Sequence, residues 1–190
     1  MRGDAAGRGA PGLRWRRWVL ALALGGLPAG SAVAAETRHG VVEFVPDGDT
    51  VFVGMASGPR LKCRLVGIDA PEVRHRRRDG TETPGQPFGM EAKRTLEQWA
   101  LRRQVSVEVH GRDAYRRSLC VIHQAGRNLN LELVREGYAW VGQGRRVDAP
   151  AALRRDLMAA EAGARSARRG LWADPDPEPP WLFRRRAGRR

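Results

Sequence analysis

The chain has 190 residues, which is enough for one domain with a sizeable hydrophobic core. Its 34 lysines and arginines outnumber 21 aspartates and glutamates, and arginine supplies nearly all of the net charge of +13. Arginine pairs with phosphate, so the charge favours a polyanionic partner, but an arginine-rich codon usage explains it equally well. Two cysteines, without zinc-ligand spacing, exclude a disulfide-built mini-domain and a cysteine-based zinc site.

Residues 1–35 resemble an export signal. A positive stretch, "RWRRW", precedes the short apolar run "WVLALALGGLPAG", and "SAVAAE" offers small residues for cleavage near Ala34 or Ala35. The apolar run is short for a membrane span and is interrupted by glycine and proline. We therefore expect an exported protein, periplasmic or secreted, with an uncleaved N-terminal membrane anchor as the alternative. The remaining chain stays strongly basic after this segment is removed.

The next part of the chain is rich in strand signals. Apolar and β-branched residues fill 39–45, 50–54 and 60–68, and the turn sequences "PDGDT" and "ASGP" separate them. Three successive strands joined by tight turns predict a meander. The polar stretch 73–88 contains glycine and proline and is expected to form a mobile loop.

Helical periodicity begins after this loop. Residues 89–104 place four apolar side chains on one helical face: Ala92, Leu96, Trp99 and Ala100. Two further strands are predicted over 105–110 and 118–126, followed by a short helix over 128–137 that Gly137 ends.

A last long helix is predicted over 149–169. Asp148 is its expected N-cap, Pro150 lies in its first turn, and four residues face inward: Leu153, Leu157, Ala160 and Ala164. Residues 174–190 form a proline-rich and basic C-terminal tail, whose end, "RRRAGRR", is expected to be disordered.

Five strands with interspersed helices predict an α+β fold, a β-barrel with helices. The expected architecture is a five-stranded OB-fold Greek-key barrel with about three helices, spanning residues 36–173.

Three acidic residues are candidates for the chemistry. An Asp-Gly hairpin turn accounts for Asp47 and Gly48 but leaves Asp49 unexplained. Asp69 and Glu72 flank Pro71, whose ring restricts the backbone there. Each acid alone is compatible with a solvated turn. Together they supply hard oxygens, which suit Ca²⁺ or Mg²⁺ rather than zinc, and a third carboxylate can accept a proton from a metal-side water.

Two arginines accompany these acids. Arg64 precedes Asp69 on the same predicted strand, and Arg117 opens another strand. An arginine at a strand end is most often a surface residue. Beside a metal site, however, two arginines can neutralise a phosphate and stabilise the charge that develops during its transfer.

The order and spacing of six motifs resemble the staphylococcal nuclease (thermonuclease) family. The motifs are "PDGDTV", "CRLVGIDAPE", "FGMEAKRTLE", "DAYRRSL", "NLELVREGYA" and "GLW", and together they cover residues 38–173. The resemblance implies an OB-fold barrel and Ca²⁺-dependent cleavage of phosphodiesters in DNA, RNA or both.

By matching position, the resemblance also implies the site. Asp49 and Asp69 would bind Ca²⁺ through their carboxylates and Ala70 through its backbone carbonyl. Glu72 would act as the general base, although ordering water and the neighbouring loop is an alternative role. Arg64 and Arg117 would bind the scissile phosphate.

The chain departs from the family pattern at three positions. Ala70 replaces a threonine, which matters little if only its carbonyl binds metal; Arg116 replaces a glycine and can add a phosphate contact. Gln143 replaces a tyrosine that lies near the nucleotide. Tyr115 is retained and Trp140 lies close by in sequence, so these two residues and Arg116 are the expected substrate-binding residues.

The cysteines lie close to the site arginines in sequence. Strand alternation points Cys63 and Cys120 away from Arg64 and Arg117, toward the barrel interior. We expect either a disulfide formed after export or two buried free thiols.

The sequence thus favours an exported, calcium-dependent nuclease that acts as a monomer without an obligate protein partner. The alternatives are a catalytically weak or inactive OB-fold module that only binds nucleic acid, and an envelope-associated domain whose basic tail binds anionic lipid or nucleic acid.

Overall fold

The computed structural model describes residues 36–76, 79–143 and 149–188. The predicted export signal and the expected N-cap, Asp148, lie outside these residues. In the part of the chain that is described, no helix is long and apolar enough to cross a membrane.

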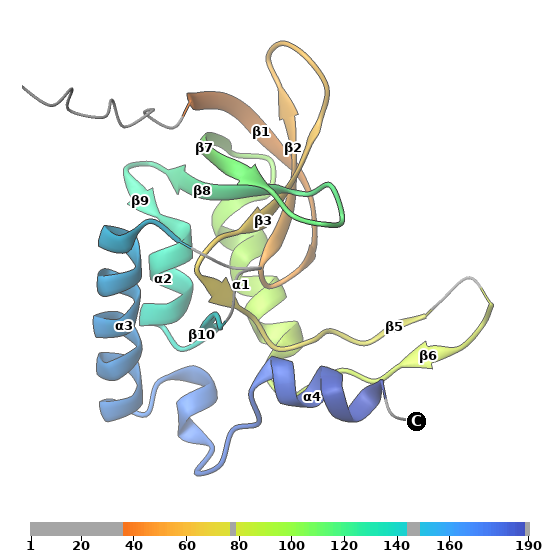
Figure 1. Ribbon diagram of the computed structural model, residues 1–190, viewed down its shortest axis with the longest axis vertical. Coiled ribbons are helices and arrows are strands. Elements are labelled where there is room, and N and C mark those ends of the chain that lie inside the picture. Colours follow the sequence, from red (N-terminus) through yellow and green to blue (C-terminus); the bar gives the residue numbers. More distant parts are fainter. Residues whose placement is uncertain (1–35, 77–78, 144–148, 189–190) are drawn as a thin grey trace, which may run out of the picture. The chain divides into compact units, whose positions relative to one another are not determined.

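In the described ranges, five strands close into a barrel (Figure 1). They are β1 (Glu36–Asp47), β2 (Thr50–Met55), β3 (Leu61–Leu65), β7 (Gln104–Arg112) and β8 (Ser118–Gln124). Neighbours in the order β3-β2-β1-β7-β8 pair antiparallel, and the parallel pairing of β3 with β8 closes the barrel. This confirms the predicted five-stranded barrel with helices.

Short strand pairs extend the barrel. They are β4 (Ile68–Asp69) with β10 (Trp140–Val141), β5 (His75–Arg76) with β6 (Glu82–Thr83), and β8 with β9 (Arg127–Asn128). The predicted third strand is divided into β3 and β4, because Gly67 adopts a positive φ of 78°. Part of the predicted mobile loop over 73–88 forms the β5–β6 pair.

Four α-helices occur among the described residues, one more than expected. They are α1 (Gly89–Ala100), α2 (Leu129–Arg135), α3 (Ala151–Ser166) and α4 (Pro180–Ala187), with a 3₁₀ turn over Gly170–Ala173. The predicted inward residues of α1 and α3 are buried or partly buried against the core. The first of these helices is shorter than predicted, because the chain turns into β7 at Gln104.

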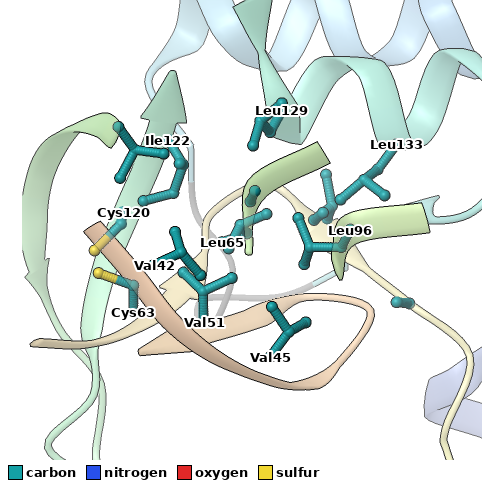
Figure 2. Packing of buried hydrophobic residues seen from close by; sticks show 14 of the residues in the cluster. Val42, Val45, Val51, Cys63, Leu65, Leu96, Cys120, Ile122, Leu129 and Leu133 are labelled. Carbon is teal, nitrogen blue, oxygen red and sulfur yellow. The ribbon is translucent and has the colours of Figure 1, made fainter. Parts of the chain in front are cut away.

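Apolar side chains from the barrel strands, α1 and α2 fill the main core (Figure 2). Cys63 and Cys120 are fully buried in it as free thiols, and their sulfur atoms face each other. Strand alternation therefore placed both side chains correctly. The disulfide between them stays a prediction.

The C-terminal segment differs from its expectation. Residues 184–188 were expected to be disordered, but they belong to α4 and its C-terminal cap. Pro180 and Phe183 are buried, and the ring of Trp181 lies 5.7 Å from that of Trp140 in an edge-on contact. Trp181 packs the basic helix onto a second hydrophobic cluster that contains Trp140 and Trp172.

Candidate active site

A cavity of about 250 Å³ brings most of the predicted site residues together. Its lining includes seven of them: Asp49, Arg64, Asp69, Ala70, Glu72, Tyr115 and Arg117. Asp47, Pro71, Gln143 and Arg184 complete the lining. Residues far apart in the sequence therefore share one polar cavity, as the motif pattern predicted.

The turn between β1 and β2 positions Asp49. Asp47 closes this turn by accepting a hydrogen bond from the Asp49 N–H at 3.1 Å. At Gly48 a Cβ atom would lie 2.7 Å from the Cβ of Ala92 and 2.8 Å from that of Ala70. Only glycine lets the turn approach α1 and the end of β4 this closely. The same turn chemistry that makes the hairpin therefore places Asp49 beside Asp69.

The short β4–β10 pair positions Asp69. Trp140 lies opposite Asp69 in this pair, and the next residue, Ala70, donates its N–H to Asp49 Oδ2 at 2.9 Å. Both aspartates are almost completely buried. The carboxylate of Asp49 is thus held by a backbone contact, whereas that of Asp69 is held by arginine side chains.

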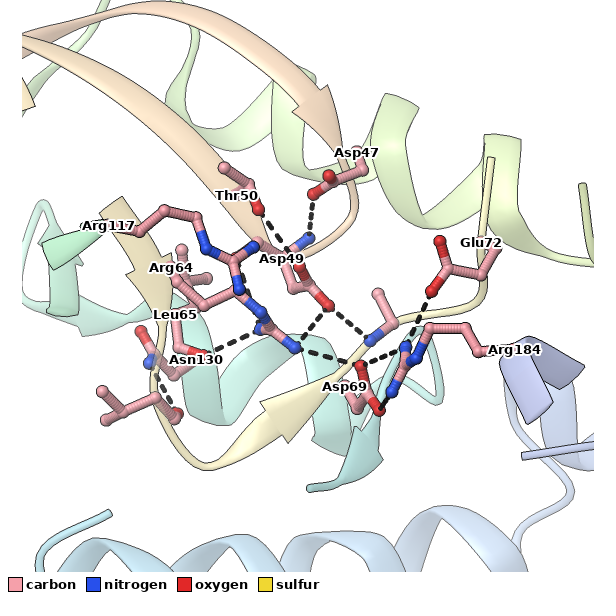
Figure 3. A network of polar contacts seen from close by, with 12 residues as sticks. Asp47, Asp49, Thr50, Arg64, Leu65, Asp69, Glu72, Arg117, Asn130 and Arg184 are labelled. Carbon is pink, nitrogen blue, oxygen red and sulfur yellow. Dashed lines mark hydrogen bonds and ion pairs between the residues drawn. The ribbon is translucent and has the colours of Figure 1, made fainter. Parts of the chain in front are cut away.

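Arg64 joins the two aspartates (Figure 3). One terminal nitrogen, Nη2, lies 2.9 Å from Asp49 Oδ2 and 3.0 Å from Asp69 Oδ1. The other, Nη1, donates to the backbone carbonyl of Leu65 at 3.0 Å. Both terminal nitrogens of this buried arginine therefore have partners inside the protein.

The buried Asp49 lacks full charge compensation. Burial raises the pKa of Asp49 to about 8; Arg64 opposes this effect, while Asp47 and Asp69 add to it. A buried carboxylate of this kind is stabilised by any further positive charge placed against it.

The donor set fits a hard divalent cation. Because a single nitrogen of Arg64 contacts both carboxylates, the two oxygens converge closely enough for one small positive centre to contact both. Carboxylate and carbonyl oxygens are the ligands that Ca²⁺ and Mg²⁺ prefer. No cluster of three or more histidine, cysteine, aspartate or glutamate side chains with metal-site geometry occurs among the described residues.

Glu72 lies at the open side of the cavity, with its side chain 35% exposed. Gln86 fixes the backbone here: its side-chain oxygen accepts the Glu72 N–H at 3.0 Å, and its own N–H donates to the Glu72 carbonyl at 2.8 Å. The carboxylate itself contacts Arg184. Glu72 is thus held near the buried aspartates while remaining accessible to water.

Asp113 orients Arg117. The Nε of Arg117 donates to Asp113 Oδ2 at 2.7 Å, and Asp113 Oδ1 accepts the backbone N–H groups of Arg117 and Tyr115 at 2.9 Å each. The guanidinium also lies 5.7 Å from the centre of the Tyr115 ring. Burial raises the pKa of Asp113, but the hydrogen bonds and charge of Arg117 outweigh it and hold this pKa below its usual value.

Two predicted substrate-binding residues lie outside the cavity lining. Arg116 is exposed and has a positive φ of 62°, which fits the glycine expected at this position. Trp140 is buried and packs edge-on against Trp172 at 4.2 Å between ring centres. Its backbone supports Asp69, and its ring belongs to the cluster that carries α4.

Sequence reasoning missed three residues at the site and assigned Asp47 correctly to the turn. Gln86 and Asp113 act on the predicted residues through hydrogen bonds, and Arg184 enters from the C-terminal helix. Two features of the sequence could have indicated them. The spacing of Asp113 and Arg117 is compatible with a local ion pair, and the apolar residues inside the basic tail are compatible with a packed helix. Nothing in the sequence indicated the pairing of Arg184 with Asp69, since the two are 115 residues apart.

The sequence of this chain is similar to those of several known proteins. Residues 62–174 match the family model described as "Staphylococcal nuclease homologue". The chain is 33% identical over 155 residues to an uncharacterized endonuclease of Haemophilus influenzae, covering 82% of this chain and 78% of that protein. It is 36% identical over 149 residues to an uncharacterized endonuclease of Escherichia coli O157:H7, covering 78% and 86%. It is also 33% identical over 162 residues to a micrococcal nuclease of Shigella flexneri, covering 80% and 82%.

Proposed function

We propose that this chain, which belongs to the staphylococcal nuclease homologue family, is an exported enzyme that requires Ca²⁺. Membership of this family makes it a nuclease, a hydrolase of phosphodiester bonds in nucleic acid. The observation that carries the calcium proposal is the convergence of Asp49 and Asp69 on one nitrogen of Arg64. The export proposal rests on the signal-like pattern of residues 1–35.

Asp49, Asp69 and the carbonyl of Ala70 would hold the ion. When bound, Ca²⁺ supplies positive charge against a phosphate oxygen and favours a nucleophilic water. Arg64 keeps the two carboxylates together through its internal contacts, and its binding of the scissile phosphate stays a prediction.

Glu72 and Arg117 act on the substrate. Glu72 accepts a proton from water as the water oxygen forms a bond to phosphorus and the opposite phosphorus–oxygen ester bond breaks. Arg117, oriented by Asp113, donates hydrogen bonds to the phosphate and offsets the negative charge of the transition state. The exposed ring of Tyr115 lies beside this arginine and can stack on a base or sugar.

Digestion of single-stranded DNA, duplex DNA and RNA, each with Ca²⁺ or with a chelator, tests the proposal. We expect products from at least one substrate that need Ca²⁺ and disappear with the chelator, and none from the Asp49→Asn protein. A folded preparation that binds these nucleic acids but gives no products would instead favour the inactive binding module. Cleavage that persists in chelator would contradict the calcium requirement.

Fractionation of cells that produce the full chain tests export. A processed protein in the periplasm or medium is the expected result. An intact chain in the membrane fraction would indicate the uncleaved anchor.

A further inference from the structure

Arg184 of α4 contacts two carboxylates of the active site, those of Asp69 and Glu72 (Figure 3). Its Nη2 lies 2.7 Å from Asp69 Oδ2, and its Nη1 donates to Asp69 Oδ1 at 3.1 Å and to Glu72 Oε1 at 2.7 Å. Both oxygens of Asp69 and one oxygen of Glu72 therefore face this guanidinium. Bidentate contacts of this kind are among the strongest that a carboxylate makes with a side chain.

Packing of α4 against the rest of the domain positions this arginine. Pro180 and Phe183 are buried, and Trp181 packs against Trp140. The side chain of Gln86 donates to the carbonyl of Glu178 at 3.0 Å, just before the helix. Because Gln86 also holds the backbone of Glu72, the same residue ties α4 and the predicted general base together.

Arg184 and a divalent cation need the same carboxylate. Asp69 has two oxygens, Arg184 contacts both, and Arg64 contacts one of them as well. An ion that binds Asp69 must approach an oxygen that Arg184 already contacts, and the nearby positive charge of Arg184 repels it. The side chain of Arg184 is 47% exposed, so it can turn toward solvent while α4 stays docked.

We propose that Arg184 is a built-in counter-ion of the cation site, which the cation displaces from Asp69 and which thereby sets the cation affinity. This inference rests on the proposed calcium dependence. In the cation-free enzyme, Arg184 pairs with both Asp69 and Glu72 and holds their side chains in place. Once the cation binds Asp69, the guanidinium is released from Asp69 and stays beside Glu72.

Calcium titration by calorimetry without nucleic acid tests the proposal directly. We expect the full chain carrying Arg184→Gln to bind Ca²⁺ roughly tenfold more tightly than wild type, because it loses a competing charge and its contacts with Asp69. Arg185→Gln removes the same charge from the next position of the same helix and should change the affinity less than about twofold, as expected for an exposed charge.

Arg184→Lys serves as a second variant that keeps the charge. It loses the bidentate geometry, so we expect an affinity between those of wild type and Arg184→Gln. Circular dichroism of each variant confirms that the protein is folded. Equal or weaker Ca²⁺ binding by Arg184→Gln would overturn the proposal.

Ca²⁺ binding and nucleic acid cleavage by wild type separate the counter-ion role from the calcium requirement. If wild type binds Ca²⁺ and cleaves nucleic acid while Arg184→Gln binds Ca²⁺ no more tightly, only the counter-ion role is contradicted. If neither protein binds Ca²⁺, the proposed calcium dependence and the counter-ion role both fall.

Discussion

The carboxylate of Asp49 accepts the backbone N–H of Ala70 at 2.9 Å, which joins two segments 21 residues apart in the sequence. This bond fixes the first residue before β2 against the end of β4, where Asp69 lies. Asp49 therefore has a structural role and a proposed chemical role in one side chain. The two roles can be separated by substitution, because an uncharged amide oxygen can still accept the Ala70 N–H.

Replacing Asp49 by asparagine should abolish activity and preserve the fold. The amide oxygen can still accept the Ala70 N–H, but the charge that would bind the cation is lost. We expect nuclease activity to fall at least about 100-fold, with Ca²⁺ binding weakened in calorimetry. The matched variant Asp49→Ala also leaves a buried N–H unpaired and should lower the free energy of unfolding by about 1–3 kcal/mol more. An Asp49→Asn protein with normal Ca²⁺-dependent cleavage would contradict the cation assignment.

Replacing Glu72 by glutamine should affect the reaction alone. Its side chain is partly exposed and its backbone is held by Gln86, so the free energy of unfolding should change by less than about 0.5 kcal/mol. Loss of a general base lowers kcat by roughly 10² to 10⁴. Glu91→Gln, at an exposed position of α1, is the matched control and should keep full activity. Full activity of the Glu72 variant would exclude it as the base and leave the cation site unaffected.

The barrel could be predicted because its signals are local. Alternating β-branched residues and Asp-Gly or Ser-Gly turns are visible in short windows, and the helical periodicity around Leu96 and Leu157 is equally clear. Asp49 was recognised because the turn left it without a structural explanation. Its actual partner, the N–H of Ala70, depends on a tertiary approach that no local pattern contains.

The C-terminal helix could not be predicted for a related reason. Residues 184–186 are three arginines, a composition typical of disorder, and the helix is short. Its position depends on the burial of Phe183 and on the packing of Trp181 against a hydrophobic cluster built from distant segments. The counter-ion contact of Arg184 exists only because that docking occurs.

Replacing Asp113 by asparagine should lower activity through Arg117. The asparagine cannot form the ion pair that holds the Arg117 guanidinium, so phosphate binding should weaken and kcat/KM should fall about tenfold. A double-mutant cycle gives the decisive readout: Asp113→Asn should have little further effect in an Arg117→Gln protein. Equal losses in both backgrounds would show that Asp113 acts independently of Arg117.

The pH dependence of the same pair follows from the lowered pKa of Asp113. A carboxyl group whose pKa is lowered by folding stabilises the protein above its unfolded pKa, near 3.8, and loses this contribution as the pH falls through the folded value. Wild type should therefore keep the contribution from neutral pH down to about pH 4. The difference in unfolding free energy between wild type and Asp113→Asn, measured by urea denaturation, should stay constant in that range and shrink below it.

The two cysteines should form a disulfide when the protein folds under oxidising conditions. Their sulfur atoms face each other in the core, and the bond would close a loop of nearly 60 residues, worth about 4 kcal/mol in the chain-entropy model. A hydrogen bond with Cys63, together with burial, raises the pKa of Cys120, so the folded, reduced protein holds little of the thiolate that attacks an oxidant. The bond should therefore form during folding and only slowly afterwards. Thiol titration of exported protein, unfolded without reductant, should find no reactive thiol, whereas two reactive thiols would show that the cysteines remain free.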